Sequence, residues 1–110
     1  MNIKDVTYAI GIFIEKYYND TNRVELPKWG FIIKQIFNVK VLELKEVSDN
    51  LWTFKAATKI TKTEEFKSIS MEQTFNIIGS AKVTSHIGRG TTEQLPVVEL
   101  VKITQISEPK

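Results

Sequence analysis

The sequence predicts an α+β domain in which one or two N-terminal helices pack on a curved antiparallel sheet of four to five strands. The prediction depends on a change of hydrophobic period near Asn38. Before this residue, apolar side chains recur every three or four positions, which is the spacing of one helix face. After it, apolar and polar residues alternate, as on a strand. Because no helical pattern separates the later strands, a parallel sheet with crossover helices is excluded.

The first helix is predicted from Asp5, a suitable N-cap, to the polar turn at residues 19–22. Gly11 lies inside this helix and lowers its intrinsic stability, and the missing side chain would let the sheet approach closely. Two further apolar residues, Tyr8 and Ile12, suggest burial on more than one side. The stripe expected to face the sheet consists of Val6, Ala9, Ile10, Phe13, Ile14 and Tyr17.

A second helix is predicted over residues 27–38. Pro27 suits a first helical turn, and Asn38 is a common residue at a helix end. The apolar residues between them follow helical spacing, although Gly30 interrupts the pattern: Trp29, Ile32, Ile33 and Ile36.

The first strand is predicted over residues 39–47, and its facing stays open. Val39 and Val41 share one parity, whereas Leu42 and Leu44 share the other. Either both faces are covered, or a bulge shifts the register within the strand.

A turn at residues 48–50 leads to the clearest strand, 52–60, whose alternate apolar side chains define one face. The next turn is expected at residues 62–64. Segment 69–87 is then predicted as one long strand bent at Gly79, because its apolar residues keep odd parity on both sides of this glycine. A hairpin with a three-residue loop would also preserve that parity.

Residues 88–92 are predicted as an exposed loop, followed by a final strand from Pro96 to Ile106 and a short polar tail at 107–110. Helices followed by a long, curved antiparallel sheet resemble the α+β rolls of the cystatin-like and NTF2-like superfamilies. This resemblance is one of topology over most of the chain, without a shared functional motif. It implies a class that includes carriers, small enzymes, secretion components, and immunity or inhibitor proteins.

Composition narrows the class of protein. A chain of 110 residues with 42% apolar and 25% charged residues suits one globular domain, 1–110. The absence of cysteine excludes disulfides and thiolate sites, and we expect no cofactor. Because neither a signal peptide nor an apolar stretch of bilayer length is present, we expect a cytoplasmic protein without a membrane span.

The charge balance disfavours nucleic acid as a partner. The net charge is only +2, and Arg23 and Arg89 are the sole arginines, although arginine is the usual residue for recognising phosphate and guanine. Lysines at positions 55, 59 and 67 could still form a basic stripe on one sheet face. Nucleic-acid binding is therefore kept as a third hypothesis, weaker than the two given below.

Two residues would be candidates if the protein were an enzyme, although no catalytic set stands out. His86 is the single histidine, so a multi-histidine metal site is excluded. It lies on the polar parity of its strand, as a solvent-facing residue would. Glu99 shares parity with Val97 and Val101. It is expected mainly as an outward side chain or a carboxylate paired with a lysine; the alternative is a partly desolvated carboxylate suited to acid or base chemistry.

The leading hypothesis is a non-enzymatic protein-binding module, such as an inhibitor, immunity or accessory protein. The binding candidates are Arg89, between two loop glycines, and the aromatic residues Trp29 and Tyr18, which are predicted to be partly exposed. The alternative is a small NTF2-like pocket enzyme or ligand carrier that uses the concave sheet face. The partner would be another protein of unknown identity, and an open sheet edge would also allow a homodimer.

Overall fold

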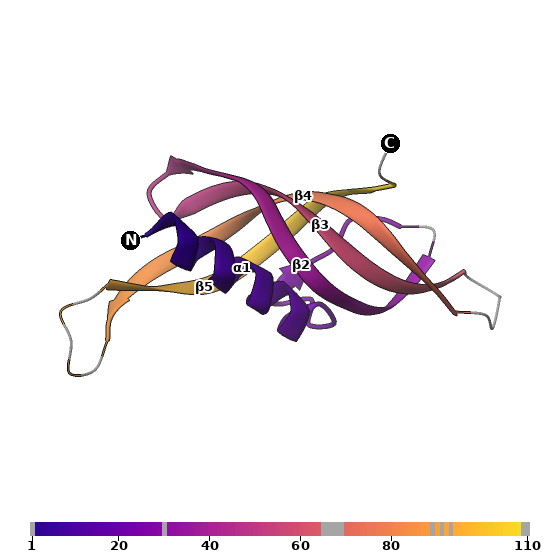
Figure 1. Cartoon of the computed structure of the whole chain (residues 1–110), viewed down its shortest axis with the longest axis horizontal. Helices are drawn as coiled ribbons and strands as arrows, with labels where there is room; N and C mark the ends of the chain where they lie inside the picture. The colour runs from indigo at the N-terminus through magenta and orange to yellow at the C-terminus, as the bar shows by residue number, and fades with distance from the viewer. Residues whose placement is uncertain are drawn as a thin grey trace.

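The computed structural model describes residues 2–29, 31–64, 70–88, 90, 92 and 94–108. Within these ranges the chain forms one helix followed by five strands in a single sheet of order β1-β5-β4-β3-β2 (Figure 1). The short β1 pairs with β5 in parallel, and all other pairs are antiparallel. The elements are α1 (Ile3–Tyr17), β1 (Val24–Glu25), β2 (Phe31–Ser48), β3 (Leu51–Glu64), β4 (Ser70–Ile87) and β5 (Gln94–Ser107).

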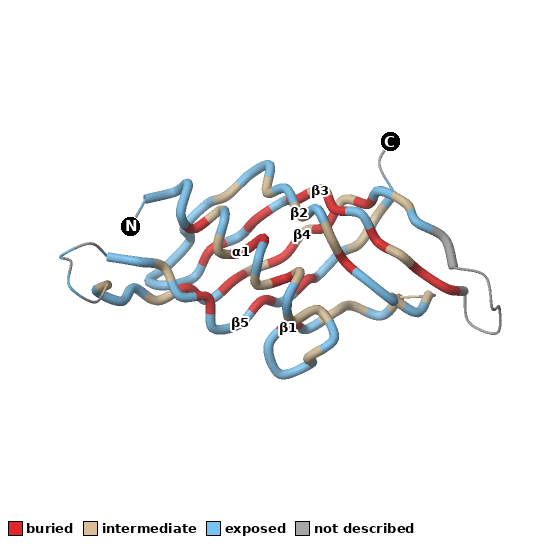
Figure 2. Tube along the Cα trace, turned by 60° about the horizontal axis from the view of Figure 1, so that its bottom comes forward, coloured by how far each residue is buried: buried red, intermediate tan, exposed pale blue. Residues whose placement is uncertain are grey.

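The core lies between α1 and the concave side of the sheet. The helix crosses this side and packs mainly against β2 and β5, which flank it (Figure 1). Along the strands beneath the helix, buried residues alternate with more exposed ones, and the buried ones form the inner face of the sheet (Figure 2). The predicted α+β class and the predicted contact between the helix stripe and the sheet are therefore confirmed. The core includes Val6, Ile10, Ile14, Trp52, Phe54, Phe75, Ile77, Val83, Val101 and Ile103.

The helix begins and ends earlier than predicted. Asn2 is the N-cap, because its side-chain oxygen accepts a hydrogen bond from the Lys4 amide at 2.9 Å. Asp5 lies instead in the first turn, where a carboxylate interacts favourably with the helix dipole. The helix ends at Tyr17, and residues 18–23 form turns.

The prediction of a second helix over residues 27–38 is wrong, because most of this segment belongs to β2. Two register shifts explain the misleading spacing: one lies between Ile33 and Gln35, the other between Phe37 and Lys40. Each bulge inserts an extra residue, so the inward positions Ile33, Ile36 and Val39 recur every three residues instead of every two. A bulged strand thus imitates the period of a helix.

The predicted start of the first strand at Val39 is consequently also wrong, while a bulge resolves its ambiguous facing. The register shifts again between Val41 and Glu43, which makes Leu42 an extra, 57% exposed residue. Val41 and Leu44 both face inward, opposite the buried Ala56 and Phe54. The change of parity seen in the sequence is therefore a local insertion rather than a strand covered on both faces.

Segment 70–87 forms one strand, as predicted, with an irregularity at Gly79. The pairing of β4 with β5 shifts between Ile78 and Gly79. A Cβ at Gly79 would collide with the carbonyl oxygen of Lys102 and would lie 3.1 Å from Cζ of Phe54. Glycine is needed at this position because two backbones approach each other closely.

The remaining boundaries differ from prediction in three places. The turn expected at residues 62–64 is wrong, because these residues continue β3. The last strand begins at Gln94, slightly before Pro96, and extends to Ser107. Strand β1 has no sequence signal, being two residues long and held by pairing with β5. No helix among the described residues is long and apolar enough to span a membrane.

Candidate functional site

Glu99 is exposed and paired with a lysine, as in the favoured of its two predicted arrangements; the alternative, a desolvated inward carboxylate, is wrong. The pairing of β4 with β5 shifts between Lys82 and Val83, whose partners are Leu100 and Val98. Glu99 is therefore the extra residue of a bulge, and it is exposed while Val98 is buried. Its carboxylate lies 3.4 Å from the Lys82 ammonium. This arrangement is a surface ion pair, and it provides no apolar environment for acid or base chemistry.

His86 lies near the end of β4, where its strand partner is Leu95. Its side chain is exposed, as its parity predicted. Gln73, a polar residue on the odd-parity apolar face of β4, is half-buried. Arg89, the third binding candidate, lies outside the described residues.

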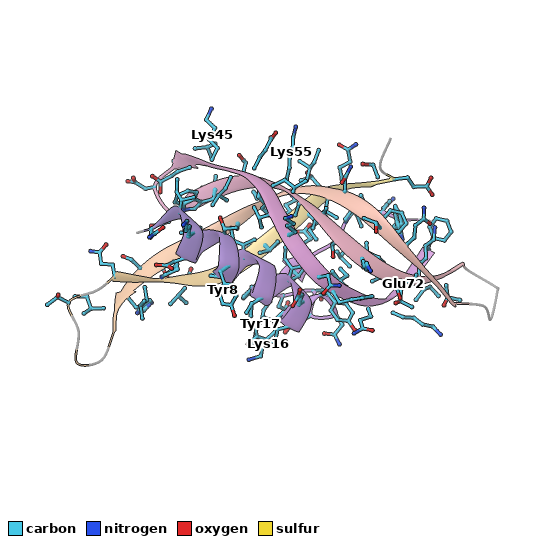
Figure 3. The ribbon with its side chains drawn as sticks, in the orientation of Figure 1. Tyr8, Lys16, Tyr17, Lys45, Lys55 and Glu72 are labelled. Carbon is cyan, nitrogen blue, oxygen red and sulfur yellow. The ribbon has the colours of Figure 1, made fainter. Side chains whose placement is uncertain are left out.

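Over the described residues, the outer face of the sheet carries lysines paired with glutamates instead of a continuous basic stripe. Lys55 pairs with Glu43 at 3.6 Å, and Lys59 pairs with Glu72 at 3.7 Å. Lys55 projects away from α1, as does the neighbouring Lys45 (Figure 3). Each of the two paired lysines thus has an acidic neighbour on the same face. Position 67 lies outside the described residues.

The structure brings the other two binding candidates together. Tyr18 and Trp29 line the same cavity of about 300 Å³, next to the C-terminal end of α1. We call this cavity the aromatic pocket. Its walls come from the end of the helix, from the connection to β1 and from the start of β2. The lining residues are Tyr18, Asn19, Thr21, Leu26, Pro27, Trp29, Phe31 and Ile33.

Local contacts hold the aromatic pocket in shape. The Tyr18 hydroxyl donates a hydrogen bond to the carbonyl oxygen of Lys34 at 2.8 Å, which ties the helix end to the first bulge of β2. The Trp29 ring packs edge-on against Phe75, with centroids 5.4 Å apart, and contacts Phe31 at 5.3 Å. Its indole nitrogen is buried without a hydrogen-bond partner among the described residues. Both aromatic candidates are thus half-buried and fixed.

The connection that forms the rim is organised by Asp20. Its backbone carbonyl accepts hydrogen bonds from the amides of Arg23 and Val24 at 3.0 and 2.8 Å. Its side chain accepts a hydrogen bond from the Asn22 amide at 3.0 Å and lies 3.5 Å from the Arg23 guanidinium. The chain then enters β1, where the Arg23 carbonyl accepts a hydrogen bond from Val101. These contacts pre-form the rim without a ligand.

Sequence reasoning missed Lys62, which supports the pocket from behind. Its side chain is only 5% exposed, and its ammonium lies 3.6 Å from the ring centroid of Phe31 and 5.0 Å from that of Phe75. This geometry is a cation–π contact with both rings. The even parity of the inward residues from Trp52 to Ile60 continues to Lys62 and could have indicated its facing.

A second cavity, which we call the α1–β2 groove, has a volume of about 640 Å³. Its floor lies where Gly11 meets β2, since a Cβ at Gly11 would be 3.2 Å from the Val39 carbonyl oxygen. The close approach expected from Gly11 is therefore confirmed. The groove is lined by Ile3, Lys4, Thr7, Tyr8, Gly11, Ile12, Glu15, Val39, Lys40 and Val41.

The exposure of the groove residues corrects the expectation that α1 is buried on several sides. Tyr8 is 72% exposed and Ile12 is 43% exposed, and Tyr8 projects from the outer side of the helix (Figure 3). Opposite them, the amide of Val39 donates a hydrogen bond to Oε1 of Glu15 at 2.9 Å, which connects the helix to the second bulge of β2. The groove is thus an apolar surface at the seam between helix and sheet.

Within the described residues, no group of three or more histidine, aspartate or glutamate side chains is placed to hold a metal ion. Comparison with known protein families, curated proteins and solved structures finds no match to this chain. Inferences about function therefore depend on the geometry of the two cavities.

Proposed function

We propose that this protein is a non-enzymatic module that binds another protein, and that one apolar side chain of the partner enters the aromatic pocket. The observation that carries this proposal is the meeting of Tyr18 and Trp29 in one cavity of about 300 Å³. Pockets of this kind, lined by aromatic residues, accept the anchor side chains that dominate protein–protein affinity. The exposed residues Asn19 and Thr21 supply the polar rim that surrounds such an anchor site.

The rigidity of the pocket supports the same proposal. Tyr18 is held by its hydrogen bond to Lys34, and Trp29 is held between Phe31 and Phe75. Because these side chains are already ordered, binding a partner would cost little side-chain entropy in this protein. An inhibitor, immunity or accessory protein needs a preformed surface of this type and no catalytic group.

We also propose that the fold belongs to a known type of α+β roll. A single helix across the concave side of a long, curved, mostly antiparallel sheet supports assignment to the cystatin-like or NTF2-like rolls. The alternative function, a small pocket enzyme or ligand carrier, would need an open ligand site on this concave face. Here that space holds α1 and fully buried side chains, which include Ile10, Ile14 and Phe75. This packing favours a binding module over a pocket enzyme or a carrier that uses the concave face.

The ion pairs of the outer sheet face also favour a protein partner over nucleic acid. Lys55, Lys59 and Lys82 each lie within 3.7 Å of a glutamate. A phosphate backbone would have to displace these carboxylates and would meet them as like charges. Among the three hypotheses, binding to a protein thus has the strongest structural support.

The test uses a substitution that obstructs the pocket without touching the core. Thr21 is exposed at the rim, so Thr21→Arg places a long charged side chain at the entrance. Thr53→Arg, at an exposed position of β3 that does not line the pocket, is the matched control. Each protein is used to capture partners from the source cell, which are identified by mass spectrometry, and affinities are then measured by calorimetry.

We expect the wild type and Thr53→Arg to capture the same partner with equal affinity. Thr21→Arg should bind it at least about tenfold more weakly, since blocking an anchor pocket removes more than 1 kcal/mol. Equal binding by both variants would refute the assignment of the partner site to the aromatic pocket.

A further inference from the structure

The charges around the α1–β2 groove are unbalanced in favour of cations. Lys4 and Lys40 are exposed, and neither forms an ion pair among the described residues. The acidic residue of the groove, Glu15, already accepts the hydrogen bond from Val39. A ligand that covers the groove therefore meets two lysines without partners, and an anionic group would complement them.

The groove is long, and most of the residues that line it are apolar. From Ile3 to Glu15 the helix rises by about 18 Å at 1.5 Å per residue. Ile3, Tyr8 and Ile12 form the helix wall, and Val39 and Val41 form the strand wall. Ile3 and Tyr8 are 59% and 72% exposed, so a large apolar surface of the groove is open to contact with a ligand.

The backbone of β2 does not favour an extended peptide as occupant. A peptide that adds to a sheet edge needs a regular row of free amide and carbonyl groups. Along the groove this row is broken by register shifts between Phe37 and Lys40 and between Val41 and Glu43, and the Val39 amide is already bonded to Glu15. A peptide lying there would leave its own backbone groups unpaired against apolar walls, which is costly.

We propose that the α1–β2 groove binds one molecule of a long-chain aliphatic carboxylate. The chain lies along α1 against Tyr8, Ile12 and Val41, and has no polar groups to satisfy. The carboxylate lies at the Lys4 end, because the Glu15 carboxylate repels it from the other end. Lys40 lies on the strand wall next to Val39, toward the Glu15 end, and adds positive charge to the groove as a whole. This site is separate from the aromatic pocket, and it does not depend on the proposed protein partner.

The experiment uses dodecanoate, kept below its critical micelle concentration, and the full chain labelled with ¹⁵N. Binding is followed by calorimetry and by chemical-shift changes of backbone amides. Dodecyltrimethylammonium, which has the same chain and a cationic head, tests the charge. Vesicles containing anionic phospholipid, in a separate titration, distinguish a monomeric acyl chain from a membrane surface as the source of the ligand.

Two pairs of variants locate the site. Lys4→Ala/Lys40→Ala removes both groove cations, and Lys28→Ala/Lys45→Ala removes two exposed lysines that do not line the groove. Ile12→Asp places a carboxylate in the groove, and Ile32→Asp does the same at an exposed β2 position outside it. Both isoleucines are partly exposed, so circular dichroism should show folded proteins in each case.

We expect saturable binding of one dodecanoate, with shift changes concentrated in residues 3–15 and 39–41. The Lys4→Ala/Lys40→Ala variant should bind about tenfold more weakly, and Ile12→Asp should show no binding, while both controls match the wild type. Equal binding of the cationic amphiphile, shift changes elsewhere, binding only to vesicles, or equal effects of a variant and its control would each overturn the proposal.

Discussion

Removing the Glu15 carboxylate should weaken the attachment of α1 to the bulge of β2. In the wild type, Oε1 of Glu15 accepts a hydrogen bond from the half-buried Val39 amide at 2.9 Å. Because Asn38 and Val39 lie where the register shifts, this amide has lost its regular ladder partner. Glu15→Ala would leave it without an acceptor inside the protein, whereas Glu15→Gln keeps a carbonyl oxygen in the same place.

The magnitude follows from opposing effects. A hydrogen bond to a charged acceptor contributes about 1.5–3 kcal/mol, and less here because the site is partly open to solvent. Loss of a carboxylate near the helix C-terminus gains about 0.3–1 kcal/mol, and this gain is common to both variants. We therefore expect Glu15→Ala to be about 1 kcal/mol less stable than Glu15→Gln. For a domain of total stability about 5–15 kcal/mol, this difference is easily measured.

The assay combines urea unfolding, followed by circular dichroism, with hydrogen exchange of individual amides. In Glu15→Ala the Val39 amide should exchange faster than in Glu15→Gln, while amides in the centre of β3 exchange alike in both. If the two variants unfold at the same urea concentration and protect Val39 equally, the hydrogen bond contributes nothing. The role assigned to Glu15 in docking the helix would then be wrong.

Substitutions at three further positions test the core, the buried cation and the loop. Phe54→Ala should cost about 3–5 kcal/mol in denaturant melts, because Phe54 is 2% exposed beside Gly79; a loss below about 1 kcal/mol would contradict its place in the core. Lys62→Met keeps the volume between Phe31 and Phe75 and should change stability by less than about 1 kcal/mol, whereas Lys62→Ala should cost about 2 kcal/mol or more. Equal shifts of the melting temperature in the two variants would refute a packing role for Lys62. Arg89→Ala, outside the described residues, should leave the melting temperature unchanged and weaken partner binding by about 1–3 kcal/mol in calorimetry; unchanged affinity would remove Arg89 from the interface.

The sequence alone determined those elements whose side-chain period is regular. The stripe from Val6 to Tyr17 has an unbroken helical period, and α1 buries it as predicted. The alternation from Trp52 to Ile60 and the constant parity on both sides of Gly79 likewise predicted β3 and β4. In these segments the sequence pattern and the observed burial agree. The reason is that every residue keeps regular helical or extended geometry, so the side-chain period is not shifted by a bulge.

The tertiary structure decided the places where a strand departs from that regular step. Bulges in β2 give residues 31–39 an apolar period that resembles a helix, and a bulge in β5 makes Glu99 face solvent. Each bulge is defined by how its strand pairs with a neighbouring strand. The two residues of β1 are a strand only because β5 lies beside them. The cavities also arise from contacts distant in sequence: Tyr18 meets Trp29 across the connection that contains β1, and Gly11 meets Val39 where the helix crosses β2. Such contacts are absent from the local pattern, because they form only when the chain has folded over itself.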